Sequence, residues 1–158
     1  MKAGLIVVAI IAVVAGIGWI VAQPKGTDEE QVMAQVGVMQ EALREKNFRK
    51  LMGTISEDYQ GVGGRKDELR IQVIGLFRDS GELSAATDAL EVTVSGDTAQ
   101  ITTTIFATME SKGGSRQEFT FPAEATFRRE EGRKFLVYPV PVWRLTSANA
   151  RMVTEGFF

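Results

Sequence analysis

The 158-residue sequence contains neither cysteine nor histidine. Disulfide bonds, thiol nucleophiles, thiolate or imidazole metal sites and attachment of a lipid to a cysteine are therefore excluded. General-base catalysis by an imidazole is excluded as well, including the serine triad that depends on it. With 18 basic and 20 acidic residues, the formal charge of -2 gives no electrostatic reason to expect a nucleic-acid partner. The composition thus excludes many enzyme classes without indicating a substrate.

The sequence does contain one long hydrophobic run, residues 3–22, made only of Ala, Gly, Leu, Ile, Val and Trp. At about 1.5 Å of rise per residue, a helix of this length spans the roughly 30 Å hydrocarbon core of a bilayer. A cleaved secretory signal peptide is the alternative, because Lys2 gives a basic start, but signal-peptide hydrophobic regions usually hold about 7–15 residues. The length therefore predicts a retained single-pass anchor over residues 1–23, followed by a linker at 24–27.

The small residues of this run gather on one half of a helical wheel drawn at about 100° per residue. They let a second helix approach closely, which a helix surrounded by lipid does not need; chance segregation is the alternative. The predicted helix-packing face consists of Gly4, Ala9, Ala12, Ala15, Gly16, Gly18, Trp19 and Ala22. We expect it to contact other transmembrane subunits or a second copy of the chain within the bilayer. The short basic N-terminus favours an inner-membrane protein whose domain faces the periplasm.

Three helical segments are predicted after the linker. Residues 27–30 form a capping-box pattern, and apolar residues recur at helical spacing over 32–43. A second, shorter apolar segment covers 48–55 and leads into a glycine-rich loop. The third helix is predicted to be capped by Asp67 and stopped by Gly81.

From about Leu83 the apolar residues alternate with polar ones, which predicts an antiparallel sheet with one apolar and one Thr/Glu-rich face. Helices should cover the apolar face, so the expected class is α+β. In the last strand, residues 135–145, Pro139 and Pro141 favour a sheet edge, a bulge or an early end. The turns are predicted at 95–97, 111–115 and 131–133.

Several short sequence motifs, taken in their order along the chain, resemble those of a known superfamily. They are 42–48 (ALREKNF), 51–52, 56–59 (SEDY), 68–70, 76–77, 94–99 (VSGDTA) and 127–132 (FRREEG). Over residues 28–145 the chain resembles the NTF2-like superfamily, whose cystatin-like cone-shaped fold occurs in SnoaL-like and ketosteroid-isomerase-like proteins. The resemblance implies a curved sheet wrapped on helices, with a pocket at the wide end. It implies a shape rather than an activity, because no catalytic set of these enzymes aligns here.

Two tyrosines and three acids are candidates for chemistry, because a tyrosine beside a carboxyl of shifted pKa stabilises an enolate. They are Tyr59 and Tyr138, with Asp58, Asp88 or Glu124. A structural role is favoured, since Asp58 lies in a polar stretch and Glu124 falls on the outward register of its strand. We therefore expect no catalytic residue, no cofactor and no metal site.

Four inward phenylalanines are candidates for lining a ligand pocket, although such rows more often form the core. They are Phe119, Phe121, Phe127 and Phe135. After the predicted domain at 28–145, the tail 146–158 ends in apolar residues that need burial on the domain or on a partner.

Two functions remain open. The first is a noncatalytic accessory or stabilising subunit of a larger bacterial membrane complex, with energy-transducing photosynthetic or respiratory complexes as the leading hosts. It rests on the predicted helix-packing face and on the absence of any sign of chemistry. The second is a membrane-tethered binder of a small apolar ligand, or an enzyme similar to the ketosteroid isomerases, using the cone pocket.

Overall fold

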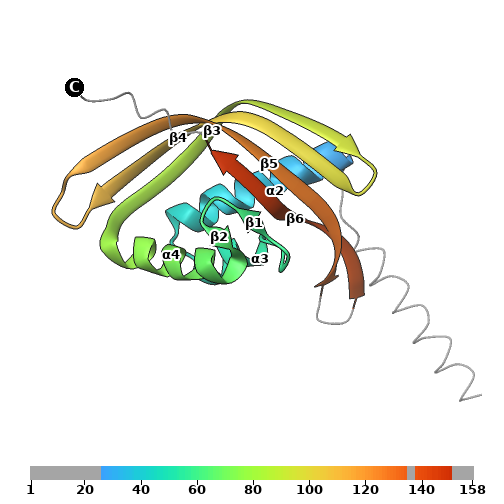
Figure 1. Cartoon of the computed structure of the whole chain (residues 1–158), viewed down its shortest axis with the longest axis horizontal. Helices are drawn as coiled ribbons and strands as arrows, with labels where there is room; N and C mark the ends of the chain where they lie inside the picture. Colours follow the sequence, from blue (N-terminus) through green and yellow to red (C-terminus); the bar gives the residue numbers. More distant parts are fainter. Residues whose placement is uncertain (1–25, 135–137, 151–158) are drawn as a thin grey trace, which may run out of the picture. The chain divides into compact units, whose positions relative to one another are not determined.

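The computed structural model describes residues 26–134 and 138–150 (Figure 1). The predicted anchor with its small-residue face, from Gly4 to Ala22, lies outside the described residues, as does Phe135. Among the described residues, no helix is both long enough and apolar enough to cross a bilayer.

The first described helix, α2 (Asp28–Arg44), begins at the predicted capping box. The Glu30 amide donates to Thr27 Oγ1 at 3.2 Å, and the Thr27 amide donates to Glu30 Oε2 at 3.0 Å. These two bonds satisfy backbone donors that the first turn of a helix leaves unpaired, so the predicted helix start is confirmed. The helix buries Val32 and Ala42 completely.

A tight turn joins α2 to the short helix α3 (Phe48–Gly53). The Asn47 amide donates to Ala42 O at 2.8 Å and the Lys46 amide to Leu43 O at 3.1 Å, which is the Schellman pattern. Lys46 has a φ of 52°, a conformation that usually selects glycine at this position. Its ammonium donates to Ser80 O at 2.5 Å, so the long side chain connects the turn to the start of the sheet.

The glycine-rich loop forms a two-residue hairpin of β1 (Gln60–Gly61) and β2 (Gly64–Arg65), followed directly by α4 (Lys66–Asp79). The prediction that Asp67 caps this helix is wrong. Glu68 accepts the Arg65 amide at 2.8 Å, which places the cap two residues earlier. Gly81 does not stop the helix either, because the chain is already extended at Ser80 and enters a strand there.

The four-stranded sheet has the order β3 (Ser80–Ser95), β4 (Thr98–Ser111), β5 (Arg116–Lys134) and β6 (Tyr138–Ala150). The β3–β4 and β4–β5 pairs are antiparallel, and the first two predicted turns are confirmed. The proline-containing strand lies at a sheet edge, as Pro139 and Pro141 indicated, and it continues past residue 145.

The predicted third turn at 131–133 is wrong, because β5 runs through these residues to Lys134. Gly132 is buried, and a Cβ atom built on it would lie 2.8 Å from both methyl carbons of Val142. The glycine therefore permits close approach of the neighbouring strand rather than a change of chain direction.

The described chain forms two compact units, a small one at residues 26, 130–134 and 138–142 and a main one at 27–129 and 143–150. In the main unit, α2, α3 and α4 lie on one side of the sheet (Figure 1), which confirms the predicted α+β class. Its principal core contains Val32, Met52, Ile55, Tyr59, Ala99, Ile101, Phe127, Trp143 and Leu145.

A β-bulge divides β3 into two halves. Asp88 pairs with Thr104 and Glu91 with Thr102, so β3 holds one residue more than β4 in this interval. Ala89 within the bulge has a φ of 50°, and Thr103 Oγ1 donates to Asp88 O at 2.8 Å. Because of this extra residue, odd-numbered residues before the bulge (Leu83, Ala85) and even-numbered residues after it (Val92, Val94) lie on the same face of β3. This is the face that the helices cover.

Candidate functional site

An apolar cavity of about 240 Å³ lies in the main unit, where α2 and α4 face strands β3, β4 and β5. Nearly all of its accessible wall is apolar, and no titratable residue lines it in the described part of the chain. The lining residues are Leu43, Leu76, Leu83, Ser84, Ala85, Ala107, Thr108, Met109, Phe119 and Phe121.

Two alanines on the covered face of the sheet explain why space remains there. Ala85 on β3 pairs with Ala107 on β4, and Ala107 pairs with Phe119 on β5. Two of the three neighbouring side chains in this row are therefore only methyl groups. The neighbouring row joins Leu83 to Met109. Since an alanine side chain reaches less far from the sheet than leucine or methionine, the row Ala85–Ala107 leaves a hollow between the sheet and the helices.

The cavity contains apolar side chains that are not fully covered. Leu76 on α4 is 37% exposed and Phe119 on β5 is 38% exposed. Covering such surface is favourable because apolar atoms are removed from water. The cavity therefore has an open side with apolar atoms that a ligand would shield.

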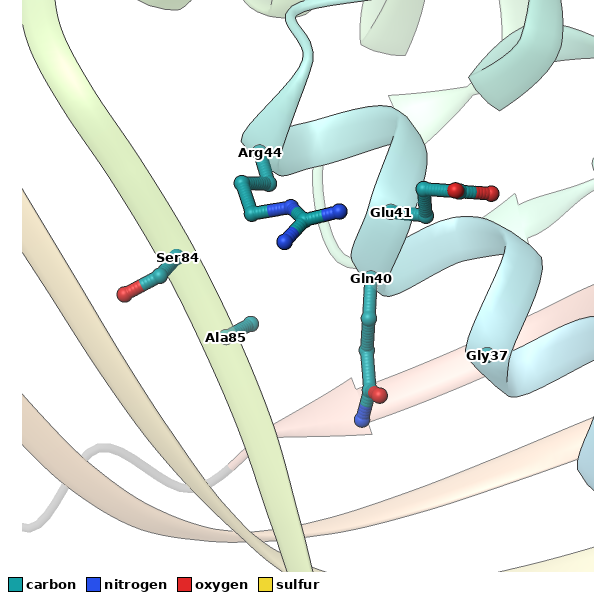
Figure 2. A pocket seen from close by; sticks show the side chains of 6 residues that line it. All are labelled: Gly37, Gln40, Glu41, Arg44, Ser84 and Ala85. Atoms are coloured by element: carbon teal, nitrogen blue, oxygen red, sulfur yellow. The ribbon is translucent and has the colours of Figure 1, made fainter.

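A polar hollow of about 330 Å³ shares Ser84 and Ala85 with the apolar cavity (Figure 2). Arg44 and Gln40 extend from α2 into the space beside β3, whereas Glu41 turns away. Gln40 Nε2 donates to Thr87 Oγ1 at 3.2 Å. Glu41 forms a hydrogen-bonded ion pair with the Lys50 ammonium, and this bond lowers the pKa of Glu41 below its ordinary value.

The predicted phenylalanines separate into different places. Phe119 and Phe121 line the cavity, whereas Phe127 is 1% exposed and belongs to the principal core. All three face the same side of β5, and they differ in their position along the strand. The sequence did not single out Leu43, Leu76 or the alanine pair as cavity residues, because apolar residues that line a cavity follow the same periodicity as residues that fill the core.

The structure gives the candidate catalytic residues other roles. Tyr59 is 2% exposed and its hydroxyl donates to Val62 O at 2.8 Å, while burial raises the pKa of Tyr59. Asp58 and Tyr59 line a separate polar hollow of about 260 Å³, but the Asp58 carboxylate pairs with Arg128 at 2.8 Å. Asp88 and Glu124 are exposed on strands, and Tyr138 belongs to β6. Among the described residues, no group of three or more acids is placed to hold a metal ion.

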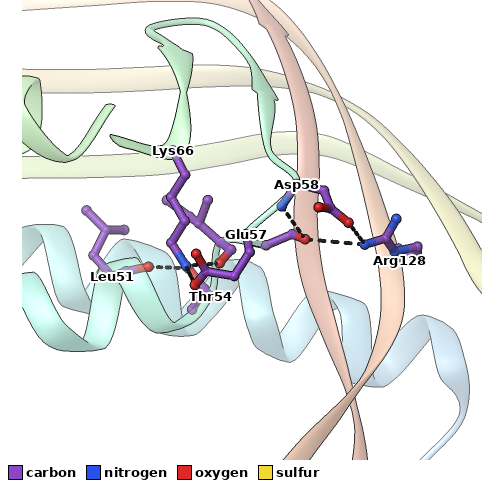
Figure 3. A network of polar contacts seen from close by, with 8 residues as sticks. Leu51, Thr54, Glu57, Asp58, Lys66 and Arg128 are labelled. Atoms are coloured by element: carbon purple, nitrogen blue, oxygen red, sulfur yellow. Dashed lines mark hydrogen bonds and ion pairs between the residues drawn. The ribbon is translucent and has the colours of Figure 1, made fainter. Parts of the chain in front are cut away.

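The polar residues around Asp58 form a network that holds the 54–58 loop in place (Figure 3). Lys66 Nζ donates to Ile55 O at 2.8 Å and to Glu57 Oε1 at 2.5 Å. The Lys66 side chain is only 11% exposed, so these two acceptors offset the cost of burying its charge. The network is structural, because its donors and acceptors bind one another.

Many solved structures share this fold, and three of them show the extent of the likeness. A proposed dehydratase of the NTF2-like family from Streptomyces avermitilis aligns with a TM-score of 0.66 and 18% identity, over 80% of this chain and 96% of its own. A proposed aromatic ring hydroxylase from Novosphingobium aromaticivorans gives 0.63 and 14%, over 81% and 90%. A ketosteroid isomerase-like protein from Erwinia carotovora gives 0.61 and 14%, over 83% and 100%.

These likenesses establish the fold of the chain as NTF2-like, and at such low identity they establish the fold alone. No protein-family model matches the sequence, and no curated protein matches it. Any inference about function therefore rests on the residues of the apolar cavity and its surroundings.

Proposed function

We propose that this domain is a noncatalytic binding module whose apolar cavity takes the hydrocarbon part of a small ligand. The observation that supports it is the cavity itself, with its apolar wall and its open side at Leu76 and Phe119. Apolar cavities with few polar groups are the usual form of small-molecule sites.

The size of the cavity limits the ligand. At about 240 Å³ it is smaller than the roughly 300–1,000 Å³ of most sites for drug-sized molecules. An engineered apolar cavity of about 150 Å³ in another protein binds benzene. A single ring or a short acyl chain therefore fits better than a fused-ring sterol.

The wall chemistry favours binding over turnover. The polar residues on the wall are Ser84 and Thr108, and general acid–base catalysis needs a titratable group within hydrogen-bond reach of the reacting atom. The enzyme names of the similar structures favour the alternative of a dehydratase-like or isomerase-like activity. The described residues that line the cavity include no acid or base, which weighs against this alternative.

Filling the cavity should weaken binding. We expect Ala85→Leu to weaken the binding of octanol by at least about tenfold, because the added carbons occupy the ligand's volume. The matched control is Ala86→Leu, which adds the same carbons at the next residue of β3, on the exposed face. Calorimetric titration of both variants and the unaltered protein measures the effect. Equal affinities of the two variants would show that octanol binds elsewhere.

A second candidate is the accessory subunit, anchored by residues 1–23 in the inner membrane with its domain in the periplasm. It is favoured by two apolar side chains on α4, Ile71 and Ile74, which are 71% and 51% exposed and lie one turn apart. Apolar surface of this kind on a helix suits a protein neighbour. Photosynthetic or respiratory complexes are the proposed hosts.

This candidate predicts comigration with a large complex in native electrophoresis after extraction in mild detergent. The double variant Ala12→Leu and Gly16→Leu should release the chain, because leucine blocks close approach of a second transmembrane helix. Val13→Leu and Ile17→Leu, on the opposite half of the helical wheel, serve as the control. Migration of the unaltered chain as a monomer contradicts the candidate.

A further inference from the structure

We infer that the ligand is an amphipathic monocarboxylate, whose head group is bound by Arg44 while its hydrocarbon part occupies the apolar cavity. This inference rests on the proposed function and adds the chemistry of the ligand's polar end. Arg44 is the last residue of α2 and follows Leu43, which lines the cavity.

Arg44 borders the polar space on both flanks of the cavity. It lines the hollow that shares Ser84 and Ala85 with the cavity. It also lines a third hollow, of about 330 Å³, that shares Leu83, Ser84 and Thr108 with the cavity. A ligand whose hydrocarbon end lies among these residues therefore places its other end near the Arg44 guanidinium.

The Arg44 guanidinium has no hydrogen bond or ion pair among the described residues, and it acts on Glu41 only through its charge. Other arginines of the main unit are engaged. Arg78 pairs with Asp79, Arg116 with Glu118, and Arg129 with Asp28. A guanidinium with unused donors beside an apolar cavity is suited to a planar anion, because its fork matches a carboxylate with two parallel hydrogen bonds.

The surrounding charges select a singly charged head group. On the α2 flank, Glu41 also lines the hollow, but its carboxylate is paired with Lys50 and points away from β3, so an anion beside β3 meets Arg44 and the Gln40 amide. On the other flank the hollow contains Glu82 and Glu110, which repel an anion, and Arg116, which is already paired with Glu118. One available cation near these acids favours a carboxylate over a doubly charged phosphate.

The test compares octanoate, octanol and octylamine, which share a chain and differ in the charge of the head group. Calorimetric titration near neutral pH should give octanoate an affinity about five- to tenfold higher than octanol, as expected for a partly exposed charge-assisted pair. Octylamine should bind more weakly than octanol, because its ammonium faces Arg44.

The decisive variant is Arg44→Met, which keeps an unbranched chain without the charge. It should abolish the preference for octanoate, so that octanoate and octanol bind the variant with equal affinity. Arg49→Met is the matched control, because Arg49 is exposed on α3 and lines none of the described cavities. Circular dichroism confirms that each variant is folded.

The outcomes separate this inference from the proposed function. If none of the three compounds binds the unaltered protein, the proposed function fails. If octanol and octanoate bind equally, if octylamine binds most tightly, or if the preference for octanoate survives Arg44→Met, the carboxylate inference fails while the binding function stands.

Discussion

Replacing Trp143 by alanine should lower the free energy of unfolding by about 3–5 kcal/mol, the usual cost of removing a buried large aromatic side chain. Trp143 lies on β6, is 2% exposed, and packs with Phe127, Ile55 and Leu145 in the principal core. Small domains have a total stability of roughly 5–15 kcal/mol. The variant should therefore lose a large share of it, as measured by urea denaturation followed by circular dichroism.

A second substitution at this position distinguishes packing from hydrogen bonding. Trp143 Nε1 is buried without an acceptor among the described residues, and the Arg129 guanidinium stacks on the ring 4.8 Å from its centroid. Trp143→Phe keeps an aromatic face for Arg129 and loses no hydrogen bond. We expect it to cost less than half as much as Trp143→Ala. Equal losses of unfolding free energy from the two substitutions would contradict this expectation. They would indicate that the indole nitrogen forms a stabilising hydrogen bond.

Gly61→Ala should cost roughly 3 kcal/mol, at the upper end of the usual range for overpacking. A Cβ atom on Gly61 would lie 2.6 Å from Ala148 O, 2.7 Å from Ala148 N and 2.8 Å from the Tyr59 hydroxyl oxygen. Two of these atoms belong to the backbone of β6 and cannot rotate away. The next residue donates its amide to Ala148 O at 3.0 Å, so the same displacement would weaken the contact of the β1–β2 hairpin with β6.

The control for Gly61 is another glycine where a methyl group has room. Gly75 lies within α4, and no atom that a new Cβ could clash with lies within 4 Å. Gly75→Ala should stabilise the protein by about 0.5–1 kcal/mol, because alanine restricts the unfolded chain and favours a helix. Chemical denaturation should thus give opposite signs for the two substitutions, and a loss of stability at Gly75 would contradict the assigned geometry.

The sequence predicted those parts of the fold whose signals are local. The capping box at Thr27 marks a helix start through contacts within one turn, and alternation along β4 marks a strand through its own side chains. Gly132 was misread because a glycine in a turn and a glycine beside Val142 look alike in sequence. Only the identity of the neighbouring strand separates the two.

The candidate site could be predicted only in part, for a similar reason. The alternation of apolar and polar residues along β5 predicted that Phe119, Phe121 and Phe127 all point toward the helices. It could not separate the two cavity residues from the core residue Phe127, because alternation does not indicate where along the strand the helices pack closely. The cavity arises where Ala85 and Ala107 meet across two strands. This pairing depends on the bulge in β3, and no local sequence pattern predicts the bulge.

The bulge at Ala89 gives the two ends of β3 different evolutionary freedom. Residues before it, such as Leu83 and Ala85, line the cavity, whereas Val92 and Val94 after it pack against the principal core. Mutations on the first segment can change the shape of the apolar cavity while the second segment retains the contacts that keep the chain folded. The cavity and the core can thus vary separately, although a single strand contributes to both.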